Sequence, residues 1–186
     1  MKATDAIRQR RSIRKFTERP VTREEIEQLL DAAVLAPNHR MTQPWRFYVL
    51  GPESRRAYGG ALGERKARRV DDAEAARLVR EKVAAEHEAL PAMIVIAMME
   101  DANPEIREED YASVMMAIQN LALAAADLGL GTHIKTGAVM QDPAARAATG
   151  VADGERIVAV VNVGEPADLP PARERAPASS FTTWRP

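Results

Sequence analysis

Residues 105–131 read EIREEDYASVMMAIQNLALAAADLGLG, the longest stretch of the chain with few polar residues after its first turn. Acidic residues at its start suit a helix N-terminus, and Gly129 and Gly131 allow left-handed backbone positions at its end. Between these signals, apolar and small residues cover most of a helical circumference, which is typical of a helix packed on several sides. The stretch therefore predicts one long, buried central helix.

The composition is that of one ordinary globular domain spanning residues 1–186. Hydrophobic residues make up 46% of the chain and charged residues 28%, and 26 basic minus 27 acidic side chains give a net charge of −1. Because cysteine is absent, we exclude disulfides, thiol redox centres and thiolate metal sites. With no signal-peptide pattern and no apolar run of roughly 20 residues, we expect a cytoplasmic protein that binds neither membranes nor nucleic acid.

Several shorter patterns surround the central helix. A capping box at residues 22–25 starts an amphipathic helix that ends by Pro37. A short helix over residues 4–10, capped by Thr4 or Asp5, precedes it. Residues 55–88 predict one or two surface helices interrupted near Gly59-Gly60 and Gly63. The remaining predicted elements are strands at 45–50, 93–98 and 157–163, a helix at 143–148, and a proline-rich arm at 167–186 that docks through Phe181 and Trp184.

Searches for common catalytic motifs are negative. Gly129-Leu130-Gly131 lacks the third glycine of a dinucleotide fingerprint and follows a helix, and no phosphate-loop lysine motif occurs. The three histidines, His39, His87 and His133, do not have the paired spacing of a metal site, and we expect His87 to be solvated. No serine stands in a nucleophile elbow. Any redox chemistry must therefore come from a bound cofactor.

A first candidate cluster is Arg10-Arg11-Ser12-Ile13-Arg14-Lys15-Phe16. Guanidinium groups bind phosphate bidentately, and a serine hydroxyl adds a short donor. The alternatives are a solvated cationic surface or, less favoured by the acidic balance elsewhere, a basic RNA-binding module.

A second cluster covers residues 36–47, APNHRMTQPWRF. Its prolines stiffen the loop, which could hold amide and imidazole donors in place for a flat heteroaromatic ligand. The alternative is a turn that an aromatic residue anchors to the core. A third is the segment from Gly131 to Gly137, which we expect to be a turn that presents backbone N–H groups to a ligand.

These motifs together resemble the nitroreductase family of FMN-dependent oxidoreductases. Arg-Arg-Ser-Ile-Arg-Lys-Phe near the N-terminus, Ala-Pro…Gln-Pro-Trp-Arg-Phe, the helix ending in Gly-Leu-Gly and the late Val-Gly-Glu-Pro are all similar to that family over nearly the whole chain. The short chain and its Pro37-Asn38-His39 variant look most like the small NAD(P)H nitroreductase branch. The resemblance implies an α+β fold, with a central antiparallel or mixed sheet surrounded by helices and a long buried central helix.

The resemblance also implies a homodimer with FMN bound at the subunit interface. By motif position, Arg10, Arg11, Ser12 and Arg14 hold the phosphate and ribityl chain. Pro37, Asn38, His39 and Gln43 come from the other subunit, and Ile134, Lys135, Thr136 and Gly137 lie along the isoalloxazine ring. Many family members have asparagine where this chain has Met41, which removes a polar contact from the loop. A C-terminal arginine, Arg173 or Arg175, is a further candidate for the phosphate.

The activity implied is ping-pong hydride transfer from NADH or NADPH, through the flavin, to nitro, quinone or similar electron-poor acceptors. The flavin carries the chemistry, so no side chain is assigned a proton-transfer role. Alternatives within the same resemblance are a flavin-fragmenting or dehalogenating enzyme and a non-catalytic flavin-binding protein.

Overall fold

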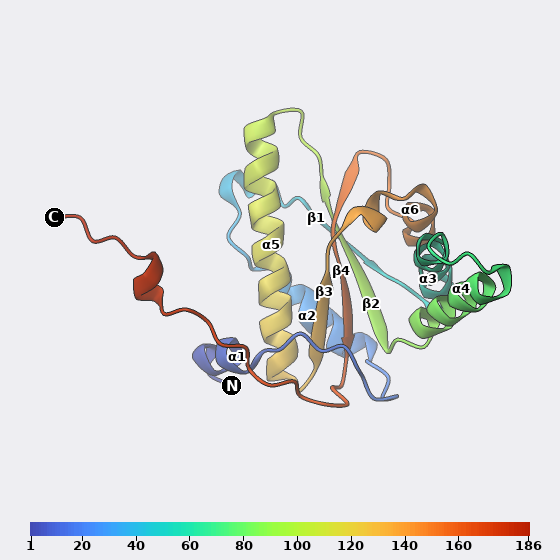
Figure 1. The fold of residues 1–186 in the computed structure, drawn as a ribbon. Helices are drawn as coiled ribbons and strands as arrows, with labels where there is room; N and C mark the ends of the chain where they lie inside the picture. The colour runs from blue at the N-terminus through green and yellow to red at the C-terminus, as the bar shows by residue number, and fades with distance from the viewer.

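A four-stranded antiparallel sheet forms the middle layer of the protein, in a computed structural model that describes residues 1–186. Its strand order is β1-β2-β4-β3, so every neighbouring pair is antiparallel. The two central strands are β2 (Ala92–Met99) and β4 (Glu155–Gly164), and the edges are β1 (Trp45–Val49) and β3 (Gly131–Lys135). Helices cover both faces (Figure 1), which confirms the predicted α+β class and makes the sheet antiparallel rather than mixed.

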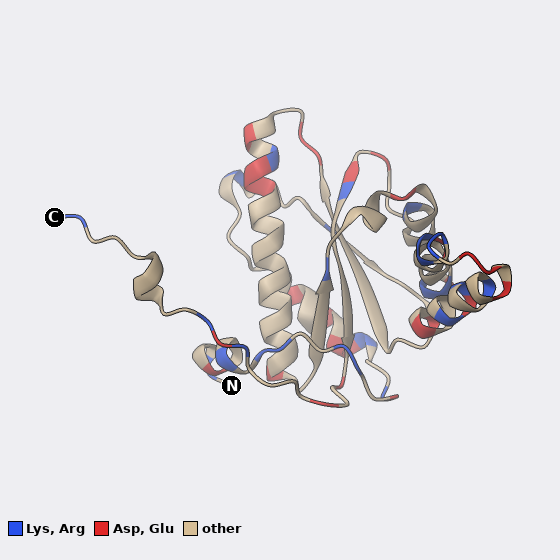
Figure 2. Cartoon of the chain, in the orientation of Figure 1, with Lys and Arg blue, Asp and Glu red and all other residues tan.

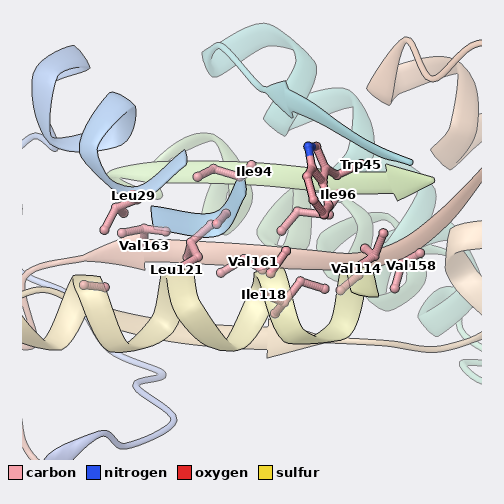
Figure 3. Packing of buried hydrophobic residues seen from close by; sticks show 14 of the residues in the cluster. Leu29, Trp45, Ile94, Ile96, Val114, Ile118, Leu121, Val158, Val161 and Val163 are labelled. Carbon is pink, nitrogen blue, oxygen red and sulfur yellow. The ribbon is translucent and has the colours of Figure 1, made fainter. Parts of the chain in front are cut away.

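One face of the sheet packs against the predicted central helix, which is α5 (Pro104–Asp127), and against α2 (Arg23–Val34). Asn103 caps α5 by accepting a hydrogen bond from the Glu105 N–H, and Gly129 ends it with a φ of 74°. The capping box of α2 is present as predicted. Apolar side chains from both helices meet those of β2 and β4 between the layers (Figure 3). The outer face of α5 is open, because Met116 on that face is 39% exposed.

The other face of the sheet carries α3 (Pro52–Ala67) and α6 (Pro143–Thr149), with α4 (Ala73–Glu88) packed outside against α3. The expected interruption at the glycines of α3 is wrong, because the helix runs through them. A Cβ at Gly59 would lie 2.7 Å from the His87 Cβ, and one at Gly63 would lie 2.9 Å from the Arg80 Cα. These glycines therefore allow α3 and α4 to pack closely, and the chain turns after residue 67 instead.

The apolar run of β2 follows from this three-layer arrangement. Ile94 and Ile96 point toward α5, whereas Met93 and Val95 belong to the smaller core under α3 and α6. A strand covered on both faces has no solvated side, so its sequence shows no alternation of polar residues. The register of β2 with β4 shifts between Ile96 and Ala97, which is a β-bulge.

The segment after α5 is a strand rather than the expected turn. Residues Gly131–Lys135 pair along their whole length with β4, with His133 opposite Asn162. Backbone hydrogen bonding to β4 fixes this strand, whereas its side chains show no apolar alternation that would predict it. Only the residues after Lys135 leave the sheet.

The chain ends differ from expectation. Helix α1 (Ala3–Gln9) begins before Thr4 and has no side-chain cap, while the Met1 amine forms an ion pair with Asp127 at the end of α5. The proline-rich segment, with the short helix η3 (Ala178–Phe181), extends away from the body (Figure 1). Phe181 is 80% exposed and Trp184 is 91% exposed, so the arm does not dock on its own chain. Even the longest helix has no apolar stretch suited to crossing a bilayer.

Candidate functional site

The N-terminal cationic segment lies beside the edge strand β3. Ser12 forms a parallel bridge with Thr132, and the Ile13 N–H donates to the Thr132 carbonyl at 2.9 Å. Gly131 permits this approach, since a Cβ there would lie 2.4 Å from the Ile13 Cγ1. The structure thus brings two of the three predicted clusters together, residues 10–16 and residues 131–137, through contacts of Ser12 and Ile13 with Gly131 and Thr132.

The basic side chains of this segment differ in their hydrogen bonds and in their exposure to solvent. Arg11 donates to the Arg8 carbonyl at 2.6 Å and to the Arg10 carbonyl at 3.0 Å, so its guanidinium is committed to the local backbone. Arg14 and Ser12 are exposed, and Arg10 is partly exposed. In Figure 2 basic residues mark this segment near the C-terminal end of α5, whereas acidic residues mark the first turns of α5 at its opposite end. Ser12 and Arg14 are therefore the freer donors for an anion.

A hollow of about 710 Å³ lies between this segment, the end of α5 and the start of the arm. Arg10, Arg11 and Thr132 line it, together with the acidic Asp127 and Glu165. The Thr132 hydroxyl is buried without a hydrogen-bond partner. The mixed charge of this hollow favours no single class of ligand.

A second cavity, of about 470 Å³, opens at the end of β3 and has a purely basic set of charged side chains. Its volume is in the usual range for small-molecule sites. No carboxylate lines it. Its walls come from α3, α4, β3 and the helix η2 (Ala138–Gln141), through the residues Tyr58, Leu62, Lys66, His87, His133, Ile134, Lys135, Thr136, Val139 and Met140.

His87 belongs to this cavity, and its predicted exposure to solvent is wrong. The ring is partly buried, its Nδ1 lies 2.8 Å from the Val83 carbonyl oxygen, and its Nε2 lies 3.3 Å from the Lys135 Nζ. Sequence spacing gave no sign of this contact, because His87 and Lys135 are 48 residues apart and meet only through the packing of α4 beside β3. Tyr58 and Lys66 on α3 were also missed, for the same reason.

Burial shapes the electrostatics of the cavity. It lowers the pKa of Lys135, helped by the Lys66 cation. Burial also lowers the pKa of His87 and His133, and neighbouring cations, Lys135 among them, act in the same direction. Arg14 is one of the cations that act on His133, which places the N-terminal cluster electrostatically next to the cavity. Imidazoles that stay neutral beside lysine cations favour a ligand with electron-rich edges.

The segment that leaves β3 has an unusual backbone. Gly137 has φ 145° and ψ 173°, a region that is essentially restricted to glycine. Thr136 and Gly137 are both exposed, and a Cβ at Gly137 would meet nothing within 4 Å. Backbone conformation, not side-chain packing, therefore requires glycine at this position.

The second predicted cluster, around Pro37–Gln43, is held in a strained conformation at the other end of the molecule. Arg40, Met41 and Gln43 have φ values of 64°, 52° and 46°, which non-glycine residues rarely adopt. Asn38 supports the loop by accepting from the Gln43 N–H at 2.7 Å and donating to the Ser113 hydroxyl at 3.2 Å.

Further bonds tie the same loop, which contains the short helix η1 (His39–Met41), to the first turns of α5. Thr42 donates to Asp110, and His39 Nδ1 lies 3.0 Å from a Glu109 carboxylate oxygen. The hydrogen bond from His39 is the main cause that lowers the pKa of Glu109. Pro37 and Gln43 are exposed beside it.

The structure does not bring the loop near the N-terminal cluster of the same chain. The loop contacts Asp110, whereas Arg10 shares a hollow with Asp127. At 1.5 Å per residue these two α5 positions are about 25 Å apart along the helix axis. A ligand held by both clusters would therefore need two chains.

The groups at the end of β3 fit a flavin mononucleotide. Ser12 and Arg14 are exposed donors for a phosphate. The cavity joins apolar walls for a flat ring to Lys135, His133 and His87 for its polar edge. The absence of carboxylates from its lining suits an electron-rich ligand and not a cationic one.

The architecture is that of nitroreductase-like proteins. Over its full length the chain superposes with a TM-score of 0.85 on a nitroreductase-like family protein from Bacillus cereus, which is 30% identical and covered to 96%. It superposes with a TM-score of 0.75 on a "putative nitroreductase in complex with fmn" from Desulfovibrio desulfuricans, which is 25% identical and covered to 98%.

The sequence leads to the same family. The chain belongs to the nitroreductase family, whose model matches residues 7–165. A relative from Bacillus subtilis bears the name "Putative NAD(P)H nitroreductase YfhC". It is 34% identical over 178 residues, which cover 93% of this chain and 89% of the relative. The Escherichia coli protein named "Putative NAD(P)H nitroreductase YdjA" is 28% identical over 166 residues, with 89% of each chain covered. The family resemblance of the sequence motifs is thus confirmed.

Proposed function

We propose that this protein is an FMN-dependent oxidoreductase that uses NADH or NADPH to reduce nitro, quinone or similar electron-poor compounds. The observation that carries the proposal is the carboxylate-free basic cavity at the end of β3, next to the exposed Ser12 and Arg14. The nitroreductase-family relatives named for NAD(P)H and the neighbour solved with FMN support the same donor and cofactor.

Residues of the N-terminal segment would hold the phosphate of the cofactor. Arg10, Ser12 and Arg14 offer charge-assisted and hydroxyl donors, while Arg11 stiffens the segment through its bonds to backbone carbonyls. Ile134, Lys135, Thr136 and Gly137 would follow the ring, with Lys135 supplying a cation at its edge. The chemistry supplied by bound FMN is acceptance of a hydride from the nicotinamide and, in a second half-reaction, reduction of the acceptor.

The chain's own contribution is orientation and electrostatics. The glycine-only conformation at Gly137 fixes the direction of the backbone N–H groups of residues 136 and 137. Lys135 lines the cavity from a half-buried position, where a positive charge acts more strongly on a ligand than it would in water. No side chain needs to transfer a proton for these roles.

A homodimer completes the proposed site. In a two-fold dimer each surface meets its own copy, so the loop of one chain can reach the N-terminal cluster of the other. Apolar residues around α5 remain uncovered in the single chain, with Leu35 79% and Met41 70% exposed. The extended arm, with Phe181 and Trp184 exposed, offers a further segment that a second copy could receive. We therefore propose that Pro37, Asn38, His39 and Gln43 serve the FMN of the partner.

The function is tested by anaerobic spectroscopy of the purified protein. We expect a yellow preparation that NADH or NADPH bleaches in the absence of oxygen, followed by recovery of colour on adding a nitroaromatic or quinone acceptor. A yellow protein that neither nicotinamide bleaches would contradict the reductase and support a flavin-binding role. A colourless protein that takes up no FMN would contradict both.

Light scattering tests the dimer. We expect the FMN-loaded protein to have twice the mass of the chain, and an apoprotein that unfolds at lower temperature, because ligand at about a hundred times its dissociation constant adds roughly 2.7 kcal/mol. A monomer that retains bound FMN would contradict the shared site.

A further inference from the structure

The contact between His87 and Lys135 joins two elements on either side of the basic cavity. His87 is in the last turn of α4, and Lys135 is the last residue of β3. Close packing positions the imidazole. Gly59 of α3 leaves room for the His87 Cβ, and the centroids of the Tyr58 and His87 rings are 6.0 Å apart, with 51° between the ring planes. The ring is therefore part of a rigid helix pair rather than a mobile surface group.

The hydrogen bonds of His87 define its tautomer. A carbonyl oxygen can only accept, so the Nδ1 that lies 2.8 Å from the Val83 oxygen carries the hydrogen. In a neutral ring the Nε2 is then an acceptor, and it receives a hydrogen bond from the Lys135 ammonium at 3.3 Å. Burial, supported by the Lys135 and Lys66 cations, lowers the pKa of His87 and keeps the ring neutral near pH 7.

Lys135 has no acidic partner that could fix its position. Its ammonium hydrogen-bonds to His87, and the nearby charge from α3 is the like-charged Lys66. A lysine side chain has several rotatable bonds and loses considerable entropy when it is ordered. The imidazole is thus the group that holds this cation at the cavity.

We propose that His87 is a positioning residue that holds the Lys135 ammonium against the ligand bound in the cavity. The proposal rests on the proposed function in taking that ligand to be FMN. With one N–H directed at His87, the ammonium has its remaining N–H groups for an electron-rich edge of the ring. A cation held there favours the electron-rich reduced cofactor, so His87 acts on the reduction potential through Lys135.

Protonation of His87 would reverse this arrangement. The imidazolium Nε2–H would face the Lys135 ammonium, with Lys66 of α3 and His133 of β3 as further basic neighbours and Tyr58 of α3 beside the ring. Glu86 is the acidic residue that acts on the ring, from α4 itself. Repulsion would then release Lys135, and the pH dependence of the potential would differ between the wild type and His87 variants.

The test compares the reduction potential of bound FMN in the wild type and five variants. Lys135→Ala is expected to lower the potential, His87→Leu to lower it by a comparable amount, and the double variant to add no further shift. His87→Gln, whose amide oxygen can accept from Lys135, should restore most of the wild-type value. Lys82→Ala, which removes an exposed cation elsewhere on α4, is the matched control and should leave the potential unchanged. A wild-type potential in His87→Leu, alongside a shift in Lys135→Ala, would overturn the proposal.

A measurement on the apoprotein separates this proposal from the proposed function. Nitrogen-15 NMR of the imidazole should show the Nδ1–H tautomer at pH 7, with an Nε2 resonance that moves in Lys135→Ala. Failure to bind FMN would refute the proposed function, and the imidazole spectrum would still decide whether His87 holds Lys135. An Nε2–H tautomer, or an Nε2 resonance indifferent to Lys135→Ala, would refute the positioning role.

Discussion

Replacing Gly137 by alanine should weaken FMN binding without any steric clash. The backbone at this residue has φ 145° and ψ 173°, and an added Cβ would meet nothing within 4 Å. The whole effect is therefore conformational strain, which costs about 1–3 kcal/mol for such a region. If the segment relaxes in the apoprotein and must be strained again when FMN binds, affinity falls by roughly 5- to 150-fold.

Two matched variants separate this effect from others. Thr136→Ala changes an exposed side chain next to Gly137 and should keep FMN affinity and activity, because the proposed role belongs to the backbone. Gly150→Ala introduces strain at another positive φ, 69°, at the end of α6. It should lower the stability by about 1 kcal/mol and leave FMN affinity unchanged.

FMN titration of each apoprotein, with urea unfolding in parallel, provides the readout. The reasoning is refuted if Gly137→Ala binds FMN as tightly as the wild type and unfolds at the same urea concentration. Loss of FMN reduction in Thr136→Ala alone would instead assign the role to the threonine hydroxyl.

Arg10→Ala should weaken FMN binding roughly ten- to a hundredfold in the same titration, since a charge-assisted hydrogen bond contributes about 1.5–3 kcal/mol. An unchanged affinity would show that Arg10 does not bind FMN. Gly59→Ala should lower the free energy of unfolding by about 1–3 kcal/mol in thermal unfolding, because the added methyl group would crowd the α3–α4 contact. Gly60→Ala is the control: this glycine has open space around it, so alanine should stabilise the helix by up to about 1 kcal/mol. Equal effects of the two substitutions would contradict the packing role of Gly59. The stability should also depend on pH, because the pKa values of His87 and His133 are lower in the folded than in the unfolded protein. The unfolded chain therefore binds more protons, and the free energy of unfolding should decrease as the pH falls below about 6.5. His87→Gln should reduce this acid sensitivity in urea unfolding, and an unchanged pH profile would show that His87 does not contribute to it.

Local signals in the sequence were sufficient for most of the fold. The capping box from Thr22 to Glu25 and the fully apolar stretch at 93–98 depend on residues close in the chain, and both elements form as predicted. Strand β3 was not predictable in this way, because its pairing depends on β4 and on Ile13. The glycines of α3 were misread since their meaning depends on α4, which a local pattern does not include.

For the candidate site, too, local motifs were predictable from the sequence and contacts between distant segments were not. Motif positions predicted residues 10–14 and 134–137 for the site, and the structure pairs Ser12 of the first segment with Thr132, two residues before the second. His87, Tyr58 and Lys66 carry no motif and enter the cavity only because α3 and α4 pack over the end of β3. Their roles, like those of the residues around Asn38 toward FMN, stay predictions until ligand binding is measured.

The length of α5 has a genetic consequence. In the proposed homodimer each site combines Arg10 of one chain with Asn38 of the other, because the helix separates these two clusters within one chain. When one subunit carries a defect at Arg10 and the other a defect at Asn38, both defects would therefore fall in the same site of the mixed dimer. One site would carry both lesions, and the other would carry neither. Two inactive alleles expressed in one cell would then complement each other, with roughly a quarter of all sites intact after random assortment of subunits.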